Sequence, residues 1–211
     1  RDLHADGMVG TAMRRVPQEE RTRAMRQRLL EATIDCLVER GWAGTSTTLV
    51  SQRAGVSRGA QLHHFPTKAD LVIAAVEQMG QRRAAELRAA TESLPRGARR
   101  TRVALDVLAQ HFTSPIFAAA LELWVAARTD PQLRAAVAPL EQKIGRETHR
   151  HTVEMLGVDE SKAGVRELVQ ATLDLTRGLG LANQLTDDSA RRKRILDRWA
   201  RTLDAAFEES Q

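Results

Sequence analysis

The sequence contains no tyrosine, one cysteine and only 3% aromatic residues. Strands favour aromatic and β-branched side chains, whereas helices favour the Ala, Leu, Arg and Glu that are abundant here. The composition therefore argues against a sheet protein and predicts an all-α fold. At 211 residues the chain is long enough for one or two domains with a sizeable core.

The single cysteine, Cys36, excludes a disulfide within the chain. It falls in an apolar helical pattern, so we expect a small buried side chain rather than a reactive thiol. No Cys, His and Asp set has the spacing of metal ligands, and His149 and His151 point to different faces of a helix. We therefore expect no metal and no cofactor.

Long hydrophobic runs are also missing. The longest apolar stretch, residues 116–127, contains Glu122 and is too short to span a bilayer. The N-terminal segment lacks the continuous apolar core of a secretory signal. We therefore expect a cytoplasmic protein with no membrane partner. The net charge of +5 and the basic pI of about 10.3 are compatible with a polyanionic partner.

Residues 45–71 carry the most specific pattern in the chain. Two short helical patterns meet at Ala54-Gly55-Val56-Ser57. Gly55 can adopt the positive φ that ends the first helix, and Ser57 can cap the second. This arrangement predicts a helix-turn-helix, which presents one helix to the major groove of DNA.

The same segment resembles the DNA-binding domain of the TetR family of transcriptional regulators. The resemblance covers residues 20–80, and the remaining chain is similar only in length and helical layout. It implies an N-terminal three-helix DNA-binding domain followed by a C-terminal helical domain for ligand binding and dimerisation. The matching positions are Gly41-Trp42, the region of Thr47, Ala54-Gly55-Val56-Ser57, Gly59, His64-Phe65, Lys68 and Leu71.

The chain divides into about nine helices. We expect Gly41 and Gly157 to end helices, and helix starts to be capped by Thr67 with Asp70, by Ser114 and by Asp130. We expect an arm without regular structure over 1–16, a DNA-binding domain over 17–80 and a ligand-binding and dimerisation domain over 81–211. Pro139 predicts a kink or a split in the seventh helix. Leu29, Leu30, Thr33, Cys36 and Leu37 form the inner stripe of the first. The expected helices are 17–40, 47–54, 57–64, 67–93, 98–112, 114–128, 130–157, 161–183 and 190–207.

The third predicted helix supplies most candidate DNA contacts. Arg58, near its N-terminus, can donate two hydrogen bonds to guanine or contact a phosphate. Thr47 is expected to cap the second helix, and Lys68 to hold a phosphate at the start of the fourth. His64 either contacts the DNA backbone, as the resemblance implies, or packs at the helix end. The candidates are Thr47, Thr48, Ser57, Arg58, Gly59, Ala60, Gln61, His63, His64 and Lys68.

The chain departs from the family pattern at Gln61 and Leu62, where the family usually has Leu followed by Tyr. A tyrosine hydroxyl is therefore not available for a phosphate. Our hypothesis is that Leu62 takes the packing role and that Gln61 faces the groove, where it could read adenine.

Mainly apolar residues of the C-terminal half are candidates for a ligand pocket or for plain core packing. The pocket candidates are His111, Phe112, Phe117, Leu121, Trp124, Met155, Thr172 and Leu175. The last two helices are amphipathic, and the resemblance implies that they pair with a second copy. The dimer candidates are Leu168, Thr172, Leu175, Leu179, Ile195, Trp199 and Leu203.

These patterns predict a homodimeric repressor that binds a palindromic operator in double-stranded DNA. A small apolar or amphipathic effector would release it by shifting the recognition helices, with the fourth helix connecting the two functions. A constitutive DNA-binding protein without a ligand remains an alternative. A helical enzyme gains no support, because the chain has neither a glycine-rich phosphate loop nor a Gly-x-Ser-x-Gly elbow.

Overall fold

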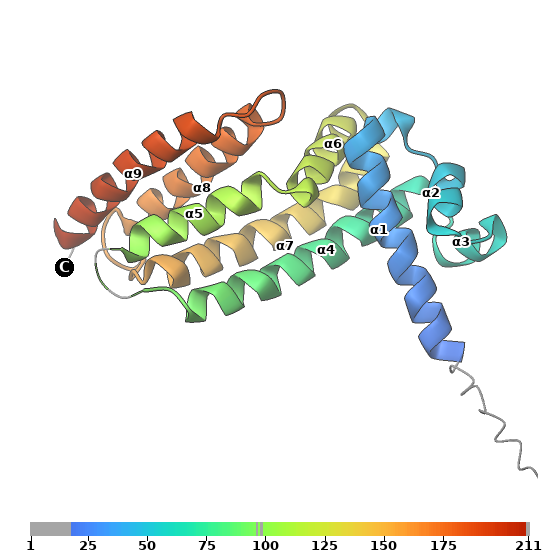
Figure 1. Cartoon of the computed structure of the whole chain (residues 1–211), viewed down its shortest axis with the longest axis horizontal. Coiled ribbons are helices and arrows are strands. Elements are labelled where there is room, and N and C mark those ends of the chain that lie inside the picture. Colours follow the sequence, from blue (N-terminus) through green and yellow to red (C-terminus); the bar gives the residue numbers. More distant parts are fainter. Residues whose placement is uncertain (1–17, 96, 98, 210–211) are drawn as a thin grey trace, which may run out of the picture.

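The computed structural model describes residues 18–95, 97 and 99–209. Within these ranges every regular element is a helix, as the composition predicts (Figure 1). The helices are α1 (Gln18–Gly44), α2 (Thr47–Ala54), α3 (Arg58–His64), α4 (Lys68–Glu92), α5 (Arg100–Phe112), α6 (Pro115–Thr129), α7 (Pro131–Leu156), α8 (Val165–Ala182) and α9 (Ser189–Glu209).

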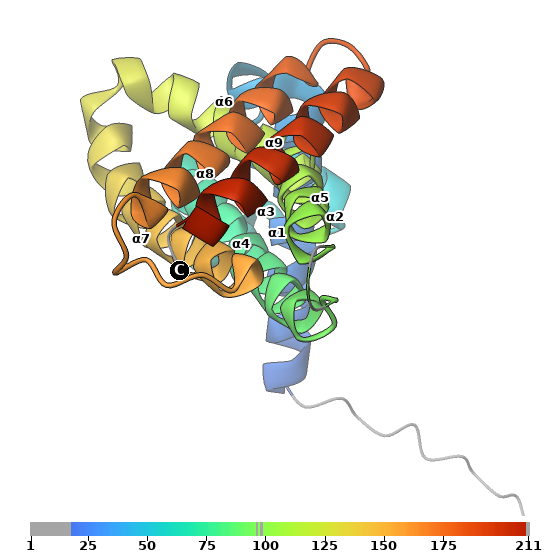
Figure 2. The same ribbon diagram turned by 90° about the vertical axis from the view of Figure 1, so that its left-hand side faces the viewer.

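The helices form two connected regions. Figure 1 shows α1, α2 and α3 at one end of the molecule, with α2 and α3 farthest from the C-terminus. Helix α4 runs from this end into the second region, where it lies along α7, and it passes the predicted domain boundary at residue 80 without a break. Helices α5, α6, α7, α8 and α9 make up the rest of the second region, and Figure 2 shows α8 and α9 side by side.

Helix ends follow the predicted capping residues. Gly55 ends α2 with φ 62°, and the Ser57 hydroxyl accepts a hydrogen bond from the Ala60 N–H at 3.2 Å. Thr67 and Asp70 form a capping box at the start of α4. Ser114 caps α6, Asp130 caps α7, and Gly157 ends α7 with φ 68°. Each cap pairs backbone groups that the helix itself leaves without partners.

Three expectations need correction, and two others fall outside the described residues. Ser46, not Thr47, caps α2, and its hydroxyl accepts from the Leu49 N–H at 3.2 Å. Helix α7 continues across Pro139 as one helix. Helix α8 begins at Val165 instead of residue 161, because Gly164 before it has a left-handed φ of 79°. The predicted arm over 1–16 and the first residue of the predicted fifth helix, at position 98, lie outside the described residues.

Helix α1 buries the predicted stripe, and its five side chains are all fully enclosed. The helical course is interrupted at Gly41, whose φ of 65° and ψ of −178° are open essentially to glycine alone. The prediction that Gly41 stops the first helix is thus confirmed in its backbone angles, and a short helical segment then continues to Gly44.

Two apolar clusters hold the fold together. The first joins residues of α1, α2 and α4 to Ala119 and Leu123 of α6 and to Val137 of α7. The second joins α5 to α7, α8 and α9 around residues such as Leu105 and Met155. The first cluster contains helices of the N-terminal region and also α6. The DNA-binding region therefore shares its core with the second region.

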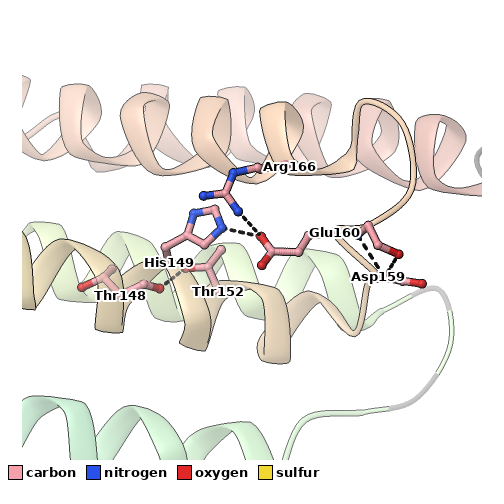
Figure 3. A network of polar contacts seen from close by, with 7 residues as sticks. Thr148, His149, Thr152, Asp159, Glu160 and Arg166 are labelled. Carbon is pink, nitrogen blue, oxygen red and sulfur yellow. Dashed lines mark hydrogen bonds and ion pairs between the residues drawn. The ribbon is translucent and has the colours of Figure 1, made fainter.

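The connection between α7 and α8 is fixed by a polar cluster (Figure 3). The Glu160 carboxylate lies 2.7 Å from His149 Nε2 and 3.3 Å from the Arg166 guanidinium. The hydrogen bond between the His149 ring and the Glu160 carboxylate holds the pKa of Glu160 below its usual value. Asp159 accepts two hydrogen bonds from Ser161 in the same turn. The cluster joins the end of α7 to the start of α8.

Among the described residues, no single helix is long and apolar enough to cross a membrane. Only α5 and α6 taken together, bent by 56° at their junction, have the length and composition for it.

Helices α5 and α8 approach so closely that their backbones are nearly in contact. A Cβ atom at Gly180 of α8 would lie 2.2 Å from the carbonyl oxygen of Phe112 in α5. A Cβ atom at Gly178, two residues earlier on the same helix, would meet nothing within 4 Å. Gly180 is thus required by packing, whereas Gly178 is not.

We expect Gly180→Ala to lower the free energy of unfolding by about 3 kcal/mol or more, because the clash is with backbone and costs at least as much as typical overpacking. Gly178→Ala is the matched control and should raise stability by up to about 1 kcal/mol through helix propensity. Urea unfolding followed by circular dichroism measures both. Equal effects of the two substitutions would contradict the close approach.

Candidate nucleic-acid interface and internal cavity

Helix α3 presents a small exposed face at the tip of the N-terminal region. Ser57 fixes its first turn, and the glycine turn before it sets its angle to α2. The side chains of Arg58, Leu62 and His63 are exposed, and Gly59 leaves open space around its Cα. A guanidinium beside a position without a side chain can approach base edges closely, which suits major-groove contact.

The hypothesis about Gln61 and Leu62 is wrong. Gln61 is fully buried, and its Nε2 donates a hydrogen bond of 2.6 Å to the carbonyl oxygen of Phe65, while Leu62 is 40% exposed. The cap at Ser57 sets the phase of α3, so that position 61 faces the core. Gln61 is tolerated there because Phe65, at the end of α3, offers a carbonyl without a helical partner. Leu62 therefore joins the exposed face, where an apolar side chain can contact a thymine methyl group.

The other predicted DNA contacts surround this face unevenly. Thr48 is exposed and Thr47 is half-buried. Neither side chain caps α2, because Ser46 does so. Ala60 and His64 are half-buried, and the His64 ring packs edge-on against His63 with centroids 5.2 Å apart. The exposed sites are thus concentrated at the start of α2 and along α3.

Lys68 was expected to hold a phosphate, but its ammonium makes its contacts within the chain. Its ammonium donates a hydrogen bond of 2.8 Å to the carbonyl oxygen of Trp42 and lies 4.1 Å from the centroid of the indole ring. Burial lowers the pKa of Lys68. The ammonium therefore joins the start of α4 to the end of α1 instead of extending into solvent.

Arg53 on α2 is also committed within the chain. Its guanidinium donates two hydrogen bonds to Glu39 at 2.5 and 2.6 Å and lies 3.5 Å from Asp35. This pairing holds the pKa of Glu39 below its usual value. Arg53 thus ties α2 to α1, whereas Arg58 is exposed and makes no ion pair with the described residues.

The second region contains a partly open cavity of about 60 Å³ between α4, α5, α6 and α7, which Arg177 of α8 also lines. Four of the eight predicted pocket residues line it, namely His111, Phe112, Phe117 and Trp124. The rings of Phe112, Phe117 and Trp124 pack edge-on in sequence, with centroids 5.2 and 6.0 Å apart. The other lining residues are Val76, Gly80, Ile116, Ala120, Leu123, Val137, Leu140, Glu141, Ile144, Gly145, Thr148 and Arg177.

The cavity contains three ionisable groups, of which sequence analysis found only His111. Burial, with Arg83 and Arg177 nearby, lowers the pKa of His111 to about 4, so the ring is neutral at pH 7. Burial raises the pKa of Glu141, opposed by Arg177 and by a hydrogen bond from Trp124. His111 Nδ1 and Arg177 Nε are buried without a hydrogen-bond partner. These atoms can bind a polar group of a molecule inside the otherwise apolar cavity.

The remaining four pocket candidates lie elsewhere. Met155 and Thr172 are fully buried in the second region's own core, and Leu121 packs against the same cluster. Thr172 accepts a hydrogen bond of 2.9 Å from the indole of Trp199. Leu175 packs against that cluster too and also lines a groove between α8 and α9. A 3.6-residue period identifies a helix's buried side, but it does not tell which of two cores that side meets.

Three of the dimer candidates line the groove between α8 and α9. Leu175, Ile195 and Trp199 line it together with Arg191, Arg194 and Arg198, and Leu168 is likewise half-buried. Thr172, Leu179 and Leu203 are buried within the protomer, so the prediction that they face a partner is wrong for this chain's own packing. Leu181 at 58% and Leu185 at 94% exposure were not predicted.

No group of three or more His, Cys, Asp or Glu side chains that could hold a metal ion occurs in the described part of the chain. Cys36 is buried, and burial raises its pKa.

Comparison with known proteins places this geometry among bacterial regulators. A family model described as "Bacterial regulatory proteins, tetR family" matches residues 29–75, from α1 into α4. The HTH-type transcriptional regulator CymR of Pseudomonas putida is 33% identical over 188 residues, which cover 86% of this chain and 90% of that regulator.

Solved structures share the fold. A putative transcriptional regulator from Pseudomonas aeruginosa PAO1 superposes with a TM-score of 0.68 at 24% identity, covering 93% of this chain and 97% of that one. The multidrug binding protein EbrR, solved in complex with imidazole, superposes with a TM-score of 0.57 at 24% identity, covering 82% and 93% of the two chains.

Gln61 and Leu62 offer a test of the orientation of α3. Gln61→Ala removes the bond to Phe65 and should lower the free energy of unfolding by about 1–3 kcal/mol. Leu62→Ala changes an exposed side chain and should stay within about 0.5 kcal/mol of the parent. Chemical unfolding of both variants measures the difference, and a larger cost at Leu62 would mean that the two side chains are exchanged.

His111 should make stability depend on pH. Between pH 6.5 and about 4 the unfolded chain binds a proton at His111 that the folded chain does not. The free energy of unfolding contributed by this residue therefore falls as pH decreases through this window, by up to about 3 kcal/mol. Urea unfolding between pH 7 and pH 4 should show a weaker pH dependence for His111→Asn than for the parent. His63→Asn, at an exposed position, is the control and should leave the dependence unchanged.

Proposed function

The chain belongs to the TetR family of bacterial regulatory proteins, and on that premise we propose that it is a homodimeric repressor which a small effector releases from a palindromic operator. Its relatives are named as transcriptional regulators, so DNA binding and regulation of transcription are the activity of the chain. The proposal of effector control rests on one observation. The apolar core that supports the N-terminal helices, with their exposed recognition helix, also borders the cavity.

DNA reading is assigned to the exposed side of α3. Arg58 donates to guanine or phosphate, and Gly59 allows the helix to approach the groove. Leu62 replaces Gln61 as the candidate for base contact, through the methyl group of thymine. Thr48, together with His63, borders this face and suits phosphate contacts.

The effector is proposed to be a small amphipathic molecule. Aromatic and aliphatic side chains line most of the cavity, and polar atoms of His111, Glu141 and Arg177 reach it. The related fold of a multidrug binding protein supports a small-molecule site in this architecture. A cavity with buried polar atoms lacking partners favours this reading over constitutive DNA binding, for which a filled core would suffice.

Pairing is proposed through α8 and α9 of two copies, which would form a four-helix interface. Partly exposed apolar side chains, Leu175, Ile195 and Trp199, line one groove between these helices. The arginines around the groove can meet the exposed Glu167 of a second copy. A symmetric pair sets two recognition helices about one DNA turn, roughly 34 Å, apart.

The deciding experiment is selection of bound duplexes from a random DNA pool at near-physiological salt. We expect a palindrome with half-sites about one helical turn apart. Arg58→Ala should weaken binding about 5- to 150-fold and relax the preference at one position of each half-site. Arg40→Ala, at an exposed position on α1 outside the proposed contacts, is the control. Recovery of unenriched, salt-sensitive DNA alone would contradict a dimeric operator-binding protein.

The selected duplex then allows a screen for molecules that release the protein. Release by a small amphipathic compound, lost when Arg177 or Glu141 is replaced, would support the cavity as the effector site. Release that survives both replacements would locate the effector elsewhere.

A further inference from the structure

A hydrogen bond joins α6, one of the helices that line the cavity, to the end of α1. Glu122 of α6 accepts a hydrogen bond from the backbone N–H of Trp42 at 2.8 Å, through its Oε2 atom. We infer that Glu122 is the positioning residue through which occupation of the cavity reaches the DNA-binding helices. The inference rests on the proposed effector site, since it names the contact by which that site would act.

The contact is built into the backbone at Gly41. A Cβ atom at this position would lie 2.7 Å from Glu122 Oε2, and φ is 65°. Glycine therefore supplies both the backbone conformation and the space that lets the carboxylate reach the next N–H. This turn of backbone also breaks the helical course of α1, which is why the Trp42 N–H is free to donate to a side chain.

The carbonyl group of Trp42 is bonded to the start of α4, which directly follows the recognition helix in sequence. The Trp42 carbonyl oxygen accepts the hydrogen bond from Lys68, and the Lys68 ammonium also lies over the Trp42 ring. Lys68 is the first residue of α4, four residues after the last residue of α3. Trp42 is thus held by α6 through its N–H and by the start of α4 through its carbonyl group.

On the cavity side, the neighbours of Glu122 are wall residues. Leu123 and Trp124 follow it directly, and Phe117 and Ala120 line the same wall from α6. The cavity of about 60 Å³ is far smaller than the roughly 300–1,000 Å³ of sites that hold drug-sized molecules. An effector must therefore displace a wall. A shift of α6 by about 1 Å suffices to take the Glu122 hydrogen bond beyond its normal length.

A competing route runs along α4, which lines the cavity at Val76 and Gly80 and also begins at Lys68. The two routes differ in one respect that can be measured. Only the route through α6 requires an acceptor atom at position 122.

The test uses a matched pair at this position and a side chain that fills the cavity. Glu122→Gln keeps an acceptor oxygen, whereas Glu122→Met has similar volume and no strong acceptor. Gly145→Leu serves as the built-in occupant, because Gly145 lines the cavity and a Cβ atom there meets nothing within 4 Å. Binding to the selected duplex and deuterium exchange of the Trp42 amide are measured for each combination.

We expect Gly145→Leu to weaken operator binding about tenfold in the parent and in Glu122→Gln, within the 5- to 150-fold range of allosteric coupling. Exchange at Trp42 should rise in the same two backgrounds. In Glu122→Met the effect of Gly145→Leu on operator binding should fall below about twofold. Glu122→Leu, which also lacks an acceptor atom at position 122, should uncouple the two sites in the same way and provides the test if Glu122→Met does not fold.

Each other outcome is decisive. An equal loss of operator binding in Glu122→Met and in the parent would assign the coupling to α4 and overturn the inference while leaving the effector site intact. Unchanged exchange at Trp42 in Gly145→Leu would overturn it too, since α6 would not have moved the contact. Raised exchange without any loss of operator binding would instead contradict the proposed effector-controlled function.

Discussion

The packing of α6 against α1 determines how the rest of the molecule can behave. Ala119, Leu123 and Ala127 of α6 belong to the same apolar cluster as the buried stripe of α1. Burying apolar surface contributes about 25 cal/mol per Å², so a shared cluster resists separation of the two regions. The orientation of α3 is consequently coupled to the position of α6. A DNA-binding unit with its own closed core would lack this coupling.

The cavity shows where stability has been given up. A buried histidine nitrogen and a buried guanidinium nitrogen without partners each cost about 1–3 kcal/mol. A filled apolar core would avoid these costs. Other buried polar atoms without partners, such as Gln61 Oε1 and His151 Nε2, lie elsewhere, so the support for a binding site is that His111 and Arg177 line one cavity beside Glu141.

Local features of the fold could be predicted from sequence because each depends on nearby residues. The turn at Gly55, the caps at Ser57, Thr67, Ser114 and Asp130, and the buried stripe of α1 are examples. Errors arose where a neighbour distant in sequence decides. Gln61 is buried because Phe65 offers a carbonyl group, Lys68 is occupied by Trp42, and Arg177 enters the cavity from α8. A charged residue on an amphipathic helix predicts exposure. Arg177 stays partly exposed and pairs with Asp174, and the packing of α8 against α5 and α7 also lets it line the cavity.

The contact between Gly180 and Phe112 also affects the mechanics of the cavity. Phe112 lines the cavity from α5. At this residue the backbone of α5 lies directly against the backbone of α8 at Gly180, which has no side chain. No layer of side chains remains there that could be compressed, so this wall is stiff. On α7, by contrast, a Cβ atom at Gly145 would meet nothing within 4 Å, so there is room beside that wall. We expect a molecule that enters the cavity to displace the walls other than the one where α5 meets α8.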